Sequence, residues 1–247
     1  FTLKQTENLS GTTGASVSPA VKSYTGFTAP SKQTITVAGD GSTVVNYYYT
    51  RNSYTVTLNK GTGIASVTGA GTYKYGQSVT IDATASNGYA WSKWSGTHTS
   101  TTKKYTFTMP ASNVTDTANA TVITYTISYN LNGGTLGSGK INPTSYNVTS
   151  AAFTLNNPTK TGYTFAGWTG ANGTTPQTTV TVTKGSTGEK SYIANWTANT
   201  DTAYTVKHWQ QNVDGGTAQN DTNFTLKETE NLAGTTGASV SPAVKSY

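Results

Sequence analysis

The chain has 247 residues, with 16 Lys and Arg against 10 Asp and Glu, so its net charge is +6. Only 11% of the residues are charged, against roughly 25% in an ordinary domain. Arg51 is the single arginine, so the sequence has no basic stripe of the kind that is typical of nucleic-acid binding. The sequence contains no cysteine for disulfides and no apolar run long enough to predict a membrane-spanning helix.

Threonine dominates the composition and supplies 53 of the 247 residues. Threonine is β-branched, suits a half-buried pleated surface and disfavours helix. Leucine and glutamate are scarce, and no window of about fifteen residues is rich in helix formers. The composition therefore predicts a mostly β protein.

The first 53 residues predict one helical turn and one hairpin. Ser18 followed by Pro19 is a helix-capping pattern, which predicts a short turn at residues 18–22. Alternating residues at 35–37 and 43–49 flank Gly39-Asp40-Gly41, and an Asp-Gly pair favours the tight turn of a hairpin.

The remainder of the chain predicts a succession of short strands. Asn-Gly, Asn-Pro and Asp-Gly turn signals separate them, for example at Asn87-Gly88 and Asn157-Pro158. Strands are expected at residues 54–58, 78–83, 104–109, 125–131, 153–155, 178–183, 192–196 and 204–210.

A long internal repeat organises these elements. Residues 224–247 repeat residues 1–24 with only two differences, Gln5 against Glu228 and Ser10 against Ala233. Identical segments at this spacing are typical of tandem arrays, in which each repeat contacts its neighbours. We therefore interpret the chain as one period of an array followed by the start of the next.

The strands group into modules of about 70 residues that share an opening. Tyr54, Tyr125 and Tyr204 each begin a Tyr-Thr-apolar strand. We expect modules at 54–123 and 124–199, and a third type in two pieces: its N-terminal part at 204–247 and its C-terminal part at 1–53. Because the connections are only a few residues long, we expect the modules to form an elongated, semi-rigid rod.

Matching segments in the modules resemble a known family. The segments Tyr129-Asn-Leu-Asn-Gly-Gly-Thr135, Pro158-Thr-Lys-Thr-Gly-Tyr-Thr-Phe-Ala-Gly-Trp168 and Tyr192-Ile-Ala-Asn-Trp-Thr197 closely resemble the Listeria–Bacteroides repeat, the B repeat of internalin-type proteins. Residues 54–123 resemble a divergent relative, with Gly88-Tyr-Ala-Trp-Ser-Lys-Trp-Ser-Gly96 and Phe107-Thr-Met-Pro-Ala-Ser-Asn-Val114. Residues 204–209 and 44–49 are similar to a mucin-binding-protein type of module.

This resemblance implies small β-grasp-like modules in tandem on extracellular bacterial surface proteins. Such modules act as stalks, spacers or adhesive segments, and the family has no catalytic residues to transfer. One departure is Asn195 before Trp196, where a lysine usually stands; the change alters a surface charge.

Five tryptophans offer either a core or a sugar-binding surface. A small module needs a large apolar anchor, and tryptophan buries about 150–250 Å². We assign Trp94, Trp168 and Trp196 to the structural core because Trp168 and Trp196 stand at fixed points of the module and Trp94 matches Trp168. Trp91, Trp209 and the outward residue of the run Tyr47-Tyr48-Tyr49, here Tyr48, are the candidates for contact with a glycan or partner.

No catalytic, metal or cofactor site is predicted. His98 and His208 stand apart, and the aspartates do not form the clustered pattern of a calcium loop. A Gly-x-Ser-x-Gly nucleophile motif is not present, and the ten acidic residues offer no clear catalytic pair. The sequence therefore argues against an enzyme.

Besides a spacer region attached to a catalytic domain elsewhere in the same protein, two functions remain open at this point. The first is a structural segment of a cell-surface protein or fibre, whose partners are neighbouring repeats. The repeats either belong to one continuous polypeptide or join head to tail by strand complementation. The second is an adhesin module that binds host or partner glycans or proteins through exposed aromatic residues. Both place the protein outside the bacterial cell, on its surface.

Overall fold

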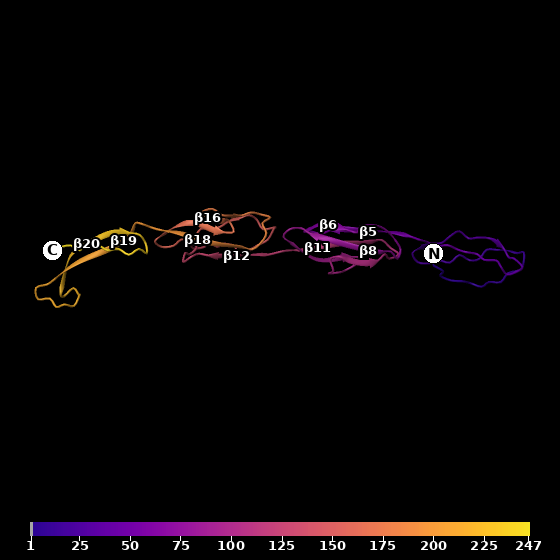
Figure 1. Ribbon diagram of the computed structural model, residues 1–247, viewed down its shortest axis with the longest axis horizontal. Helices are drawn as coiled ribbons and strands as arrows, with labels where there is room; N and C mark the ends of the chain where they lie inside the picture. The colour runs from indigo at the N-terminus through magenta and orange to yellow at the C-terminus, as the bar shows by residue number, and fades with distance from the viewer. Residues whose placement is uncertain (1) are drawn as a thin grey trace. The chain divides into compact units, whose positions relative to one another are not determined.

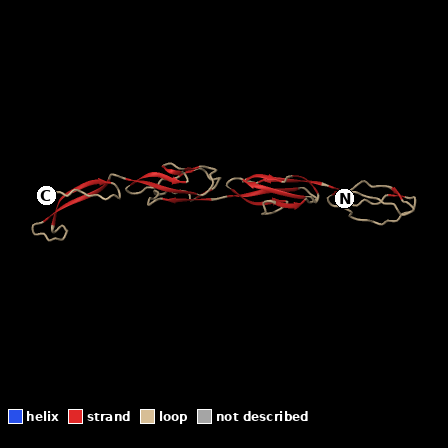
Figure 2. Cartoon of the chain, viewed as in Figure 1, coloured by secondary structure: helices blue, strands red, loops and turns tan. Residues whose placement is uncertain are grey.

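The computed structural model describes residues 2–247 and is built from strands and loops (Figures 1 and 2). The chain forms two compact units that divide between Ile123 and Thr124, and each is described by itself. Residues 2–247 contain no helix, and so no helix that is long and apolar enough to cross a membrane. The prediction of a mostly β fold is confirmed.

Residues 53–122 of the first unit form two small sheets. The four-stranded sheet has the order β7-β5-β11-β9, with β5 and β11 parallel and the other neighbours antiparallel. The three-stranded sheet has the order β10-β8-β6 and is antiparallel. The bounds are β5 Ser53–Lys60, β6 Ile64–Thr68, β7 Gly71–Lys74, β8 Ser78–Ala85, β9 Tyr89–Gly96, β10 Tyr105–Thr108 and β11 Val114–Val122.

Both sheets contribute to one apolar core. Alternate residues of each strand point inward, as the pleat requires, so Val56 on β5 and Val114 on β11 are buried side by side. Trp94 on β9 is completely buried and is the largest member of the cluster. Met109 and Ile81 are buried in the same cluster.

Residues 125–198 of the second unit repeat this arrangement. A five-stranded sheet has the order β13-β12-β18-β15-β16, with β12 and β18 parallel, and β14 pairs with β17. Trp168 on β15 is completely buried at the centre of the core. The bounds are β12 Tyr125–Asn130, β13 Ser145–Tyr146, β14 Phe153–Thr154, β15 Tyr163–Gly170, β16 Gly173–Gln177, β17 Thr181–Val182 and β18 Lys190–Ala198.

The first strand has the same neighbours in both modules. β5 lies between the short antiparallel strand β7 and the parallel last strand β11. β12 lies in the same way between β13 and β18. The first strand is therefore a central strand of its sheet in each case, paired along both edges.

The remaining segments have strands but little core. In residues 2–53, here called the head segment, β1 Ser16–Val17 pairs with β3 Ile35–Thr36, and β2 Phe27–Thr28 pairs with β4 Thr50–Arg51. In residues 202–247, the tail segment, β19 Thr202–Gln211 pairs with β20 Phe224–Gly234. Among the described residues of both segments, no hydrophobic side chain belongs to the buried core.

The structure corrects two predictions for the head segment. Residues 18–22 are not helical, because their polar groups bond across the segment: Ser18 Oγ pairs with Thr34 Oγ1 at 2.6 Å, and the Pro19 carbonyl accepts from Tyr47. Residues 43–49 alternate between half-buried and exposed side chains, as a strand does, but they form no ladder. The predicted hairpin is therefore wrong: Ile35–Thr36 pairs with Ser16–Val17, and residues 43–49 are in no strand.

Candidate interaction surface

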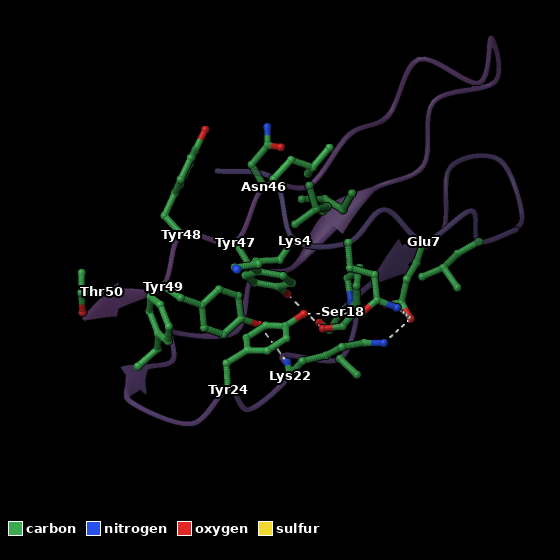
Figure 3. Close-up of a pocket in the computed structure, with 18 of the residues that line it drawn as sticks. Lys4, Glu7, Ser18, Lys22, Tyr24, Asn46, Tyr47, Tyr48, Tyr49 and Thr50 are labelled. Atoms are coloured by element: carbon green, nitrogen blue, oxygen red, sulfur yellow. Dashed lines mark hydrogen bonds and ion pairs between the residues drawn. The ribbon is translucent and has the colours of Figure 1, made fainter. Parts of the chain in front are cut away.

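The head segment encloses a groove of about 1380 Å³. Residues 2–11 and 43–51 contribute most of its lining, and residues from 17–27 and 35–37 complete it within the head segment. Lys74 and Tyr75 of the neighbouring module also contribute. Figure 3 shows the tyrosines and the Glu7–Lys22 pair around this groove.

Tyrosine hydroxyls hold residues 43–49 where no strand pairs with them. Tyr47 donates its hydroxyl to the Pro19 carbonyl at 2.9 Å and accepts from the Gln33 N–H at 3.2 Å. Tyr49 accepts from the Lys22 N–H at 2.9 Å. These bonds replace part of a backbone ladder and keep the segment extended (Figure 3).

The groove combines one ion pair with exposed apolar residues. Lys22 Nζ lies 2.5 Å from Glu7 Oε1, and this hydrogen bond and the attraction of the Glu7 carboxylate raise the pKa of Lys22. Leu3 and Leu9 are 80% and 72% exposed. Exposed apolar residues gathered in this way mark a candidate interaction surface.

The tail segment carries the same residues in a different setting. Lys245 pairs with Glu228 at 2.7 Å and with Glu230, and the Tyr247 hydroxyl donates to Glu228 at 2.7 Å. The hydrogen bonds from Lys245 and Tyr247 lower the pKa of Glu228. His208 Nε2 is buried without a hydrogen bond and faces Glu230 Oε2 at 3.8 Å.

Pairing with β19 is what distinguishes the two copies. Leu226 on β20 is 41% exposed, whereas its counterpart Leu3 is 80% exposed. The Glu230 side chain is 17% exposed, and its counterpart Glu7 is 43% exposed. Residues 224–234 are therefore better covered than residues 2–11, whereas residues 238–247 are exposed and their counterparts 15–24 are partly covered.

The three tryptophans assigned to the core lie in the two complete modules. Trp94 and Trp168 are fully buried, and their indole N–H groups donate to the Lys103 carbonyl and to Asn157 Oδ1. Trp196 is half-buried, packs against Phe165 and donates to the Leu131 carbonyl at 3.1 Å.

The three candidates for partner contact lie on different segments of the chain. Trp91 is half-buried, packs on Trp94 with ring centroids 5.4 Å apart, and donates its indole N–H to the Thr101 carbonyl. Tyr48 is 58% exposed and lines the groove. Trp209 is 40% exposed on β19, in the other unit.

A buried acid–base pair was not anticipated from the sequence. Asp116 is completely buried on β11 and accepts from the His98 N–H at 2.7 Å, while its other oxygen lies 2.8 Å from His98 Nδ1. The signal was available, because Asp116 alternates with the inward residues Val114 and Ala118. The His98 ring also packs against the Phe107 ring at a tilt, with centroids 4.2 Å apart, so the pair belongs to the packing of the module.

Residues 2–247 contain no group of three or more His, Asp or Glu side chains placed to hold a metal ion. Chemically, the groove can offer backbone ladder groups, apolar side chains and one carboxylate.

Two repeat-domain families match the chain. The model of the divergent InlB B-repeat domain matches residues 54–123, and the model of the Listeria-Bacteroides repeat domain matches residues 125–187. No curated protein and no solved structure matched the chain. The matched segments are the two modules that have complete cores.

These matches support the repeat family that the sequence motifs indicated. Listeria-Bacteroides repeats are found in bacterial surface proteins, so the chain carries a repeat segment of the kind used there. The resemblance of residues 204–209 and 44–49 to a mucin-binding-protein module stays a prediction.

Proposed function

We propose that the chain is a structural repeat segment of an extracellular bacterial surface protein, in which it acts as a stalk that sets distance. The observation that supports this most strongly is the way the modules are joined. At each of two junctions, one linker residue bonds to the segment before it and to the segment after it.

The first junction lies at Asn52 in the first unit. The Asn52 N–H donates to the Gly26 carbonyl at 2.9 Å, and the Asn52 carbonyl accepts from the Tyr75 N–H at 2.8 Å. Arg51 Nη1 also donates to the Tyr75 carbonyl. Phe27 packs edge-on against Tyr75, with centroids 5.8 Å apart. Bonds to both sides restrict rotation at this residue.

The second junction, at Asn199 in the second unit, has the same pattern. The Asn199 N–H donates to the Gly162 carbonyl at 2.9 Å, and the Asn199 carbonyl accepts from the Thr236 N–H at 2.9 Å. Gly162 lies so close to Thr236 that a Cβ would come within 2.8 Å of its side chain. A stalk needs joints of this kind, because stiffness between modules converts added repeats into added length.

Distance measurements between two spin labels test this role. Because the sequence contains no cysteine, Ser23→Cys and Thr102→Cys place one label on each side of the Asn52 junction. We expect a narrow distance distribution, and a broad one after insertion of four glycines behind Asn52. Equally broad distributions in both proteins would argue against a stiff joint.

An adhesive function is the second candidate. It is favoured by Trp209, whose large aromatic side chain is 40% exposed on β19. Binding to immobilised mucin glycans that falls at least tenfold on Trp209→Ala, but not on Trp91→Ala, would support it. Equal binding by the two variants and the parent would count against it.

A further inference from the structure

We propose that the two complete modules bear tension, and that the parallel ladder between the first and the last strand of each module is the element that resists it. The two ladders are β5–β11 in residues 54–123 and β12–β18 in residues 125–198. This inference rests on the proposed function, because a stalk transmits a pull through the two ends of each module.

The pull on the first module passes through neighbouring strands. The chain enters the module at the start of β5 and leaves it at the end of β11, and these two strands are neighbours in the sheet. They are parallel, with pairs from Val56–Val114 to Lys60–Ala118. A pull on the two ends of the module therefore draws β5 and β11 in opposite directions along their own axes.

A parallel ladder that is pulled in this way resists as a whole. Its bonds are evenly spaced, and the start of one strand lies at the opposite end of the ladder from the end of the other. Ser53 lies three residues before Val56, and Val122 lies eight residues after Val114, so the pulled ends are separated by roughly 36 Å along the strands. The strands slide apart only when several bonds break together.

An antiparallel pair that is pulled at adjacent ends behaves differently. β9 and β11 are antiparallel, and Tyr89 at the start of β9 pairs with Val122 at the end of β11. A pull on these two residues acts across the strands at one end of the ladder, so its bonds break one after another. The same module therefore has a strong and a weak direction, and a pull along the chain acts in the strong one.

The second module keeps this geometry with a different last strand. β12 and β18 are the first and last strands, and they are parallel, with pairs from Ile127–Lys190 to Asn130–Ile193. The chain enters at the start of β12 and leaves at the end of β18. The sequences of β11 and β18 differ at most positions. The direction of pulling is therefore common to both modules although the residues of the ladder are not.

Further bonds extend the first ladder at both of its ends. The Thr55 N–H donates to Asn113 Oδ1 at 2.9 Å, just before the first pair. The Gly61 N–H donates to the Ala118 carbonyl at 2.9 Å, just after the end of β5. Both bonds join the segment of the first strand to the segment of the last strand, so a slide of β5 against β11 must break them as well.

Side chains reinforce the second ladder in their own way. Tyr129 and Tyr192 pair across it, and their rings stack with centroids 6.0 Å apart. Asn132, which follows β12, donates its Nδ2 to the Ala194 carbonyl on β18 at 2.8 Å. These contacts also connect the first strand to the last.

The core resists the same movement as the ladder. Val56, Val114 and Ala118 are buried on the inner face of β5 and β11, in one cluster with Trp94. A slide along the strand axis draws these side chains through a close-packed interior. Water can reach the inner side of the ladder only after this core has opened.

Single-molecule pulling through pairs of cysteines tests the direction of strength, since the parent contains no cysteine. Thr121→Cys, on an exposed position of β11, is the common attachment point. Ser53→Cys as the second point pulls along β5 and β11, whereas Asn87→Cys pulls β9 and β11 apart from one end. We expect the rupture force at equal pulling speed to be at least twofold higher with Ser53→Cys than with Asn87→Cys. Equal forces, or the reverse order, would overturn the proposal.

A matched pair of alanine variants tests the ladder itself. Asn113→Ala removes the acceptor of the Thr55 N–H, and Gln77→Ala removes the acceptor of the Lys74 N–H, which bonds to Gln77 Oε1 at 3.0 Å. Both side chains belong to exposed residues, but only the bond from Thr55 joins the first strand to the segment of the last.

The two variants are compared under a constant pull along β5 and β11. Unfolding under force depends on the barrier along the pull, so the loss of one ladder bond should shorten the lifetime of the module. We expect a reduction of at least threefold for Asn113→Ala and a change of less than 1.5-fold for Gln77→Ala. Equal lifetimes of the two variants would overturn the role of the ladder.

The weak direction supplies the control for a general loss of stability. Pulled through Asn87→Cys and Thr121→Cys, the Asn113→Ala variant should keep the lifetime of its parent within 1.5-fold, because its lost bond does not join β9 to β11. An equal reduction in both directions would show a general destabilisation and would overturn the proposal.

These failures are distinct from a failure of the stalk, which is read from the distance distribution at Asn52. Equal strength in both directions beside a narrow distribution would leave the stalk in place and remove the resistance to tension. A broad distribution beside a strong ladder would do the reverse.

Discussion

The complete modules and the head segment show what one strand contributes to a small sheet. In residues 54–123 and 125–198, the first strand is paired on both edges and the core contains a fully buried tryptophan. In the head segment no such strand is present between residues 2–11 and 43–51, and no hydrophobic side chain of residues 2–53 is counted among the buried core. The central strand is therefore what closes the core.

The two copies of the 24-residue repeat support the same conclusion. Residues 224–234 form a strand beside β19, and the corresponding residues 2–11 do not. Conversely, Ser16–Val17 pair with Ile35–Thr36, while their counterparts in the tail segment are not in a strand. Local sequence is almost constant between the copies, so the partner strand decides the conformation.

The largest effect is expected from truncation of the buried tryptophans. Trp94→Ala and Trp168→Ala should each lower the free energy of unfolding of their module by about 3–5 kcal/mol, because each leaves a large cavity. Trp209→Ala, on a half-covered strand, should cost less than about 1 kcal/mol. Chemical denaturation followed by circular dichroism measures the free energy of unfolding of each variant. A similar loss of stability at all three positions would contradict the difference between the complete modules and the head and tail segments.

Two glycines in the head segment allow the effect of backbone strain to be measured apart from the effect of contact across the Asn52 junction. Gly14 and Gly26 both have φ of +79°, but a Cβ on Gly26 would come within 2.3 Å of the Tyr75 ring, whereas Gly14 has no atom within 4 Å of that position. Gly14→Ala should cost about 1–2 kcal/mol from the left-handed backbone alone. Gly26→Ala should lower the free energy of unfolding by about 1–3 kcal/mol more than Gly14→Ala, because the Tyr75 ring or the backbone at Gly26 must move to make room for the methyl group. Thermal unfolding measures the stability of both variants. An equal loss of stability in the two would show that the Tyr75 ring can move aside without cost.

Alkaline pH should destabilise the module at residues 125–198. Burial raises the pKa of Tyr129 from 10.0 to about 12, and burial also raises the pKa of Tyr192. The unfolded tyrosines ionise first, so stability is intact below pH 10 and declines as the pH rises from about 10 to 12. Tyr192→Phe removes one of these groups, and the variant should lose less stability over that range. An identical pH profile for parent and variant would contradict the assignment.

Acid should release the end of the tail segment but have less effect on its copy. The hydrogen bonds from Lys245 and Tyr247 hold the pKa of Glu228 below its ordinary value of 4.5, so this contribution is present above pH 4.5 and is lost as the pH falls through the lowered pKa. Gln5 occupies the equivalent position and does not titrate. The NMR signal of Tyr247 should therefore shift in acid more than that of Tyr24. Equal shifts would show that Glu228 does not anchor Tyr247.

Much of the fold could be predicted from the sequence because its signals are local. Threonine content and alternation indicated β structure, and the strand predictions at 54–58, 78–83 and 204–210 fall within β5, β8 and β19. β9 was not predicted as a strand because its partner β11 lies beyond the intervening strand β10. β20 was not predicted either, because its Lys, Glu and Asn residues are poor strand formers, although it pairs with the preceding strand β19. Residues 43–49 were predicted as a strand from their alternation, but they form no ladder in the described chain.

The groove could be predicted only in part. The repeat indicated that the head segment corresponds to a piece of a module, but the groove is lined by residues from four separate stretches of that segment, which only the three-dimensional structure brings together. The tyrosine contacts that hold residues 43–49, such as Tyr47 with Pro19, join positions 28 residues apart and have no local sequence signal.

Amide hydrogen exchange of residues 43–51 tests the central claim most directly. The claim predicts fast exchange at residues 44–49, which form no ladder, and slow exchange in β11, which is paired along both edges. Protection of residues 44–49 equal to that of β11 would contradict the account.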